Sequence, residues 1–300
     1  MQSEAERPES LSWRPVGPKG ELATYRFGMG SIPLLCVHGF AGGGVLFSPL
    51  FVGDDISMNG DVVGYSYDQR GHGSSQVMVD RDEDRDPQLN FQWARDLHSV
   101  IDAVLDETKR DSLYLLGWSL GAVVIGEYIS LYGSDSIAGV VLLAPSFSVG
   151  DRAALEFTGS EFQGALRSYL RATTHDDSVV ASDLLASVLL SPGSDAERQR
   201  VLSELAQQCR LARRRMVLAH PYQVVSQFAS LEVPVLIVHG DADRVVEPRS
   251  SKVCGEEIGA VVKIVSGCGH DLITCCLDDL RLWIARFLAA SEQPELDVLD

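Results

Sequence analysis

The chain has 300 residues, of which 45% are hydrophobic and 22% are charged, a balance that is typical of globular proteins and excludes wholesale disorder. The net charge of −17 at pH 7 repels polyanions on average, so nucleic acid and anionic membranes are not expected as partners. No apolar run reaches 18 residues, so no membrane span is expected.

Residues 1–21 are polar and predict a flexible N-terminal arm, after which an edge strand is expected to begin at Leu22. Short apolar runs then alternate with helical patterns. This alternation is typical of βαβ units and predicts a mostly parallel central sheet flanked by helices. Strands are expected at residues 32–38, 61–67, 112–118, 137–144, 233–239 and 261–266, and helices at 90–108, 121–131 and 276–290.

The alternation stops between residues 145 and 231, where several leucine-rich helical segments follow one another. We therefore expect a helical insertion at 147–231 that lies over the sheet. The core domain is then predicted to consist of residues 22–146 and 232–290, and residues 291–300 to form an acidic, mobile tail.

The six cysteines contain no CxxC pair and no spacing that is typical of metal ligands. The N-terminus does not have the charged and then apolar pattern of a secretion leader. These features predict a reduced, cytoplasmic protein. Because the histidines do not cluster at metal-ligand spacing either, no metal is expected. No G-x-G-x-x-G motif and no P-loop lysine occurs, so no other cofactor is expected.

Residues 117–121 (Gly-Trp-Ser-Leu-Gly) match the pattern G-x-S-x-G and lie between a predicted strand and a predicted helix. The motif requires this context, because a serine at the tip of a tight turn exposes its hydroxyl while small neighbours let the chain reverse. Ser119 is therefore predicted to be a nucleophile. A serine hydroxyl needs a base to take its proton and a third group to orient that base.

Candidates for these two groups follow two later strands. Asp241 and Asp243 lie just after the strand predicted at 233–239, and His270 lies just after the strand predicted at 261–266. Because catalytic groups of open α/β sheets gather at the carboxyl ends of the strands, all of these residues are expected at one edge of the sheet. The order serine, acid, histidine is that of one known hydrolase architecture.

The chain resembles the α/β-hydrolase family over roughly residues 30–146 and 232–290. The resemblance is carried by a series of motifs in order: His38-Gly39-Phe40, Asp68-Gln69-Arg70-Gly71-His72-Gly73-Ser74, the turn at Ser119, Gly240-Asp241-Ala242-Asp243, and Gly269-His270. It implies the α/β-hydrolase fold with a helical cap. It also selects Asp243 as the acid, because the acid of such enzymes lies three residues after the glycine that ends its strand. Asp241 is then interpreted as a turn-former.

An attacked carbonyl develops negative charge on its oxygen and needs backbone N–H donors there. The residue after the nucleophile, Leu120, is expected to supply one donor, and the resemblance assigns the second to Phe40. Gly39 and Trp118 are expected at the substrate pocket. For Trp118, packing beneath the turn is an equal alternative.

The expected activity is hydrolysis of a carboxylic ester, lactone or thioester through an acyl-enzyme intermediate. The expected partner is a small, largely apolar acyl ester. Acyl transfer or perhydrolysis by the same triad is one alternative, because another nucleophile can replace water in the second step. A ligand-sensing receptor on the same fold is the other, and slow turnover would distinguish it.

Overall fold

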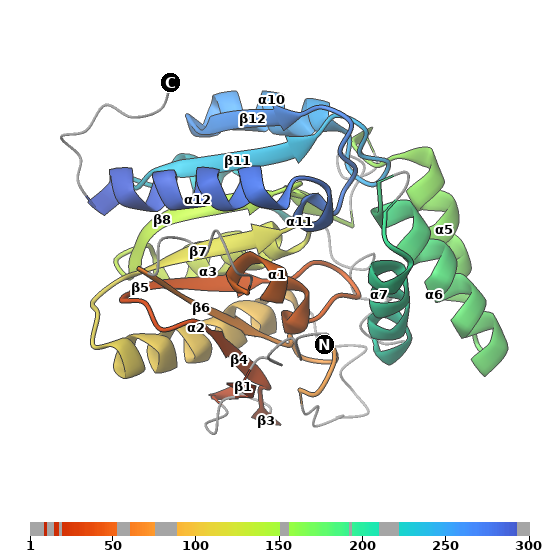
Figure 1. Ribbon diagram of the computed structural model, residues 1–300, viewed down its shortest axis with the longest axis horizontal. Helices are drawn as coiled ribbons and strands as arrows, with labels where there is room; N and C mark the ends of the chain where they lie inside the picture. The colour runs from red at the N-terminus through yellow and green to blue at the C-terminus, as the bar shows by residue number, and fades with distance from the viewer. Residues whose placement is uncertain are drawn as a thin grey trace, which may run out of the picture.

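The computed structural model describes residues 9–10, 15–17, 20–52, 61–75, 89–150, 156–191, 194–209 and 222–292. Its centre is an eight-stranded sheet in the order β1-β4-β6-β5-β7-β8-β11-β12 (Figure 1). In this order the strands are β1 (Glu9–Ser10), β4 (Thr24–Phe27), β6 (Val62–Tyr67), β5 (Ile32–Val37), β7 (Leu113–Trp118), β8 (Ile137–Leu143), β11 (Val235–Gly240) and β12 (Val261–Val265).

The sheet is parallel from β6 to β12, and the pairs β1–β4 and β4–β6 are antiparallel. Every residue of β6, β7 and β11 is buried, because helices cover both faces of the sheet. This architecture confirms the predicted α/β-hydrolase fold class and the six predicted parallel strands. The edge strand expected from Leu22 is corrected to β4, which is second from the edge because β1 pairs with it.

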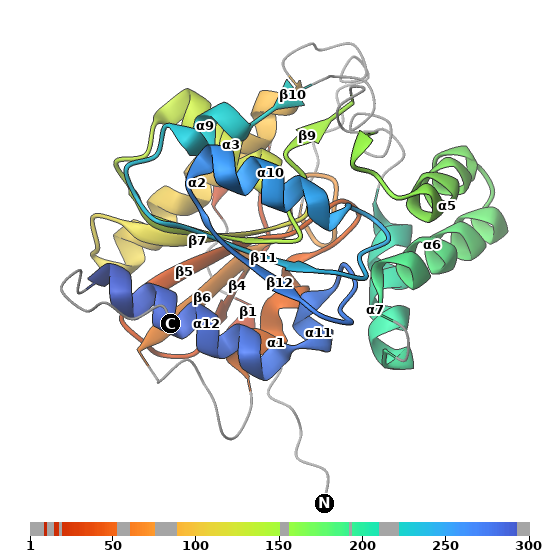
Figure 2. The ribbon, with the colours of Figure 1, turned by 90° about the horizontal axis from the view of Figure 1, so that it is seen from above.

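Two layers of helices flank the sheet (Figure 2). One face carries α2 (Leu89–Thr108), α3 (Gly121–Tyr132), α9 (Val225–Ala229) and α10 (Pro248–Ile258). The other carries α1 (Ser48–Phe51), which follows the 3-10 helix η1 (Gly44–Phe47), and also α11 (Leu272–Cys275) and α12 (Leu277–Glu292). Each layer forms an apolar core with the sheet. None of the described helices has the length and apolar character needed to cross a bilayer.

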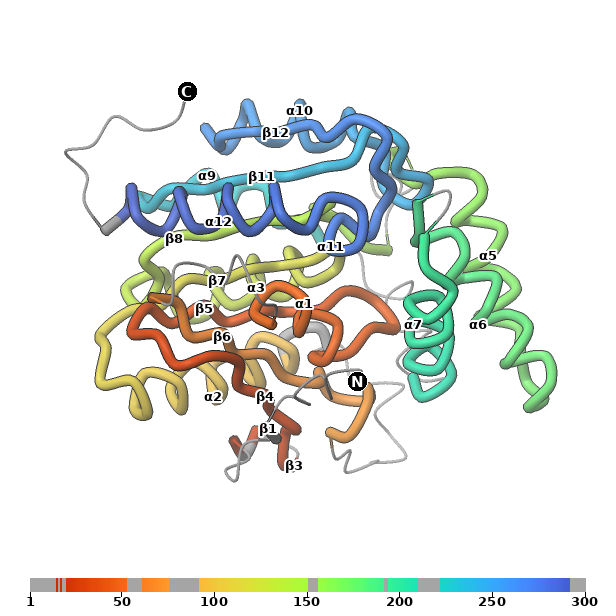
Figure 3. The backbone as a smooth tube through the Cα atoms, in the orientation of Figure 1, coloured from red at the N-terminus to blue at the C-terminus, as the bar shows by residue number. Residues whose placement is uncertain are grey.

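Three further helices lie beyond the carboxyl ends of the strands: α5 (Ser160–Arg171), α6 (His175–Leu189) and α7 (Ala196–Gln208). They follow β8 and precede β11 along the chain (Figure 3). Two short strands, β9 (Ser148–Val149) and β10 (Tyr222–Gln223), pair at the base of this segment. This α5–α7 group therefore stands at the edge of the sheet where the candidate catalytic residues were expected.

The chain ends fall partly outside the described residues. Within the arm predicted at 1–21, β1 joins the sheet, and β2 (Val16–Gly17) pairs with β3 (Gly20–Glu21). The acidic tail predicted at 291–300 lies outside the described residues from residue 293 onward.

The predicted reduced state of all six cysteines is wrong for two of them. Cys268 and Cys275 form a disulfide, whereas the four other cysteines form none. The short helix α11 folds back toward the loop after β12 and brings these two residues together, seven positions apart in the chain.

Candidate active site

Ser119 stands at the tip of a tight turn between β7 and α3. Its φ angle of 56° lies in the left-handed region, which costs a residue other than glycine about 1–3 kcal/mol. A Cβ at Gly121 would lie 2.2 Å from the carbonyl oxygen of Val37, and one at Gly117 would lie 3.0 Å from the amide nitrogen of Ala122. Close backbone approach therefore requires glycine at position 121 and leaves little room for a side chain at Gly117, in line with the small flanks of the motif.

Neighbouring backbone holds this turn in place. The Ser119 N–H donates to the carbonyl oxygen of Leu143 at the end of β8 (2.9 Å). The Ser119 carbonyl oxygen accepts from the N–H groups of Ala122 and Ser146, each at 3.1 Å. The nucleophile candidate is thus fixed from both sides, which offsets the cost of its strained backbone.

His270 lies in the loop after β12, and its side chain is buried. Its Nδ1 is 2.7 Å from Oδ2 of Asp243, so this nitrogen carries the hydrogen that the carboxylate accepts. Its Nε2 has no hydrogen-bond partner among the described residues. The Trp118 indole N–H donates to the backbone oxygen of His270 (3.1 Å). Nε2, whose lone pair is unoccupied, is therefore the ring atom that can accept a proton.

Asp243 accepts four hydrogen bonds and is buried. Oδ1 accepts from the N–H groups of Val245 (2.7 Å) and Val246 (3.0 Å), and Oδ2 accepts from His270 and from Nε2 of His239 (3.0 Å). Burial by itself raises the pKa of Asp243, but the two histidines outweigh it and hold the pKa well below its usual range. Asp243 is therefore a carboxylate that can orient His270 and stabilise its protonated form.

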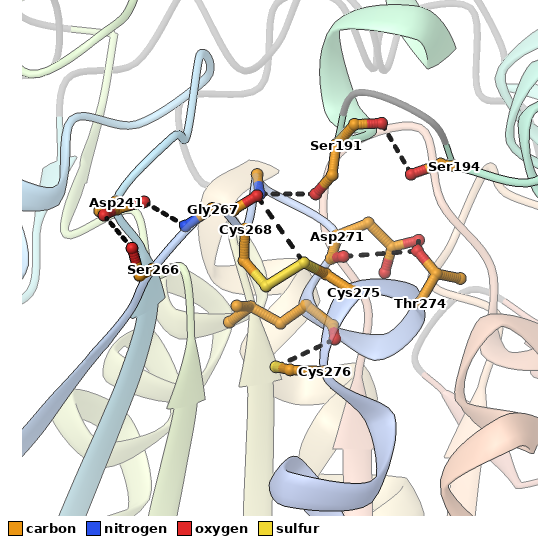
Figure 4. The surroundings of a disulfide bond; sticks show 12 residues. Ser191, Ser194, Asp241, Ser266, Gly267, Cys268, Asp271, Thr274, Cys275 and Cys276 are labelled. Carbon is orange, nitrogen blue, oxygen red and sulfur yellow. Dashed lines mark hydrogen bonds between the residues drawn. A yellow bond between two sulfur atoms is a disulfide. The ribbon is translucent and has the colours of Figure 1, made fainter.

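Asp241, two residues earlier, faces a different set of partners (Figure 4). Its carboxylate accepts from the Ser266 hydroxyl (3.1 Å) and from the Gly267 N–H (2.7 Å), at an exposed position. It therefore ties the end of β11 to the loop after β12. The structure brings Asp243 to His270, whereas Asp241 does not contact the histidine.

Ser119 and His270 line one cleft of about 270 Å³, a volume that includes space open to solvent. Gly39, Phe40 and Trp118 line it as well. The rest of its wall is apolar and comes from α5, α6 and the loop after β11: Phe162, Leu185, Leu189 and Val245. Trp118 lines the cleft, its indole N–H donates to the backbone oxygen of His270, and its ring lies beside the His270 ring.

The two predicted oxyanion donors flank the nucleophile. A Cβ on Gly39 would lie 2.9 Å from Cβ of Ser119, so glycine lets the loop that carries Phe40 pass directly over the serine. Within the described part of the chain, the N–H groups of Phe40 and Leu120 donate to no acceptor. They are therefore available to a substrate oxygen.

His38 and the glycines after Ala41 support this loop from beneath. His38 is fully buried, and its pKa falls to about 4 because burial disfavours the charged ring. Its Nε2 accepts from the N–H of Gln69 (2.9 Å). Gly43 and Gly44 pack closely against Leu205 and Ser66, away from the residues that line the cleft. These residues shape the loop and do not face the cleft.

Three residues of this region were not predicted: His239, Phe162 and Val245. A histidine inside the apolar run of β11 has the sequence signature of a core residue, and its contact with Asp243 appears only in the fold. Phe162 belongs to α5, within the predicted insertion, but no local pattern shows which of its residues faces the cleft. No group of three or more potential metal ligands occurs among the described residues.

A family model for the serine aminopeptidases of family S33 matches residues 33–274. Protein phosphatase methylesterase 1 of Candida albicans is 33% identical over 115 residues, which are 38% of this chain and only 29% of that relative. Among solved structures, the esterase RhEst1 of a Rhodococcus species superposes with a TM-score of 0.79 at 22% identity, over 93% of this chain and 98% of the other. An esterase of Exiguobacterium antarcticum gives 0.73 at 16% identity, over 93% and 100%. At these identities the two structures show a shared fold.

Proposed function

Because the chain belongs to the S33 family of α/β hydrolases, we propose that it cleaves a carboxylic ester of a small, largely apolar substrate by means of Ser119, His270 and Asp243. The observation that carries the proposal is one cleft lined by both Ser119 and His270, with Nδ1 of His270 bound to Asp243. This is the arrangement of a nucleophile, a general base and an orienting carboxylate.

The reaction follows from these positions. Ser119 Oγ attacks the ester carbonyl while His270 Nε2 takes its proton and then passes that proton to the leaving alcohol. Asp243 keeps the hydrogen on Nδ1 and stabilises the imidazolium that forms. The N–H groups of Phe40 and Leu120 bind the developing oxyanion. Water, activated by the same histidine, then releases the acid from the acyl-enzyme.

The lining of the cleft favours an ester over the N-terminus of a peptide. An aminopeptidase must bind a positively charged α-amino group, for which a carboxylate is the suitable partner. None of the described residues that line this cleft is acidic, and the nearby Asp243 carboxylate is already bound to two histidines. The apolar wall from α5 and α6 instead suits an acyl or alkyl chain, so we propose that the α5–α7 group is a cap that selects the substrate.

The test combines a fluorophosphonate probe with a panel of p-nitrophenyl esters graded in acyl chain length. We expect the parent protein to be labelled and Ser119→Ala not to be, with loss of at least ~10³-fold in kcat/KM. Aminoacyl p-nitroanilides should be poor substrates. A parent protein that resists the probe would contradict the proposal.

Two further readouts separate the alternatives of acyl transfer and ligand sensing. Products formed in the presence of a competing alcohol would identify acyl transfer, since the ester of that alcohol would exceed the free acid. Labelling of Ser119 together with turnover that is slow for every ester would instead indicate a receptor.

The predicted cytoplasmic location stays a prediction, and the Cys268–Cys275 disulfide argues against it. Disulfides persist mainly in oxidising compartments, because cytosolic thiol systems keep cysteines reduced.

A further inference from the structure

His239 is the last residue but one of β11, and its side chain is completely buried behind Asp243. Its Nε2 lies 3.0 Å from Oδ2 of Asp243 and 3.0 Å from the carbonyl oxygen of Val246. Its Nδ1 lies 2.6 Å from the hydroxyl oxygen of Ser251, in the first turns of α10. Both ring nitrogens are therefore occupied by polar partners.

These partners determine where the hydrogens lie. Asp243 Oδ2 and the Val246 carbonyl are both acceptors, so Nε2 of His239 must carry a hydrogen. The Ser251 hydroxyl can donate to Nδ1, which leaves the ring neutral with its hydrogen on Nε2. A chain of hydrogen bonds then runs from Ser251 through His239 to Asp243 and on to His270.

We propose that His239, held at Nδ1 by Ser251, is a positioning residue that fixes Asp243 and sets the proton affinity of His270. The inference rests on the proposed hydrolase function, in which His270 is the general base. Oδ2 of Asp243 is shared by the two histidines, so the carboxylate cannot rotate without breaking both bonds. Oδ1 is held separately by backbone N–H groups.

The effect on His270 has a definite sign. A hydrogen-bond donor stabilises the Asp243 carboxylate most when no positive charge lies beside that carboxylate. This is the case when His270 is neutral. Loss of that donor therefore favours protonated His270 and moves the acid limb of the activity profile to higher pH. His239 of β11 and His270 of the loop after β12 are the charged or titratable groups that act on Asp243. The Arg244 side chain next to it is turned to Glu161 and to α6.

Four variants test the proposal. His239→Phe removes the donor, and His239→Gln restores it, because a glutamine amide N–H can take the place of Nε2–H. Ser251→Ala removes the hydrogen-bond partner of the other ring nitrogen, Nδ1. Ser250→Ala is the matched control, since Ser250 is also buried in α10 but its hydroxyl has no partner among the described residues.

The first readout is kcat per active site, counted by fluorophosphonate titration so that misfolded protein is excluded. We expect His239→Phe to lower kcat about 10- to 100-fold with little change in KM, because hydrogen bonds to charged groups are of this strength. The midpoint of the acid limb of the activity profile should move to higher pH by about one unit. Ser251→Ala should show smaller changes in the same direction, whereas His239→Gln and Ser250→Ala should stay close to the parent.

The second readout does not depend on turnover. NMR titration of the imidazole nitrogens measures the pKa of His270 directly, in the parent protein and in His239→Phe, Ser251→Ala and His239→Gln. A higher His270 pKa in Ser251→Ala with no ester cleavage by any variant would uphold the inference and refute the proposed function. Parent-like kcat and His270 titration in both His239→Phe and Ser251→Ala would overturn the inference. So would a His239→Gln variant no better than His239→Phe, because the ring would then act only by its bulk.

Discussion

At the residue scale, two aspartates of one loop have separate tasks because their partners differ. Asp243 is buried and binds His270, whereas Asp241 is exposed and binds the backbone and hydroxyl of the next loop. The position of the two aspartates after their strand did not decide which of them is the catalytic acid. The resemblance to α/β hydrolases favoured Asp243. The contacts are in accord with that choice, and its catalytic role stays a proposal.

Exchange of each carboxylate for an amide separates the two roles. Asp243→Asn presents an N–H group or a weaker acceptor to His270 and should lower kcat about 10³- to 10⁴-fold, because the histidine loses its correct tautomer. Asp241→Asn keeps an oxygen for the Gly267 N–H and should change kcat less than about 3-fold. Steady-state kinetics on one ester measures both. Equal losses in the two variants would contradict the assignment.

At the scale of elements, the end of α6 and the residues after it join the α5–α7 group to both catalytic loops. The Arg244 guanidinium donates to the carbonyl oxygens of Ser187 (2.6 Å) and Leu190 (3.1 Å), where a cation also suits the negative end of the helix dipole. From the His270 loop, Gly269 N–H donates to the Ser191 hydroxyl (2.7 Å). The neighbours of both Asp243 and His270 are thus bound to one segment.

Helix α7 adds a buried ion pair to this contact. Arg198 binds both carboxylate oxygens of Asp271, the residue after His270, at 2.7 and 3.2 Å. It also donates to the carbonyl oxygen of Leu46 (3.2 Å). Both side chains are buried, with exposed fractions of 9% and 1%. The pair therefore connects α7, η1 and the loop that carries the candidate base.

Removal of one partner of this pair should be costly. Arg198→Met leaves the buried Asp271 carboxylate without its counter-ion and should lower the free energy of unfolding by about 3–5 kcal/mol, as measured by urea denaturation. Arg200→Met, on the same helix, removes an exposed ion pair with Glu204 and should cost less than about 1 kcal/mol. A similar small loss for both variants would show that the buried pair adds nothing.

At the scale of the whole molecule, the disulfide closes a loop of chain around the candidate base. His270 lies between Cys268 and Cys275, and the adjacent Cys276 stays free, with its pKa raised to about 11 mainly by burial. Figure 4 shows the disulfide between the loop after β12 and α11, with the Cys276 side chain directed away from it. The loop of the base is thereby attached covalently to the start of the C-terminal helices.

Thiol counting tests this bond. Protein purified without reductant and unfolded in guanidinium should show four reactive thiols, because six cysteines less one disulfide pair leaves four. Cys275→Ser should lower the free energy of unfolding by about 2–3 kcal/mol through the lost loop constraint. A count of six thiols would instead support the reduced state expected from cysteine spacing.

The sequence by itself determined the features that depend on neighbours along the chain. The apolar runs predicted β5, β7, β8 and β11 to within two residues at each end, because strands buried on both faces must be continuously apolar. The turn at Ser119 was equally predictable, since the strain and the small flanking residues lie within five positions. The order of strand ends also placed His270 near an acid, because parallel strands end at one edge of a sheet.

Only the tertiary structure decided which distant side chains meet. His239 looks like a core residue until β11 and α10 bring it between Asp243 and Ser251. The pairing of Cys268 with Cys275 depends on how α11 turns back, and the bond from Arg244 to α6 depends on where the α5–α7 group comes to rest. The physical reason is common to all three: such contacts form when packing brings separate segments together, and no local periodicity encodes that approach.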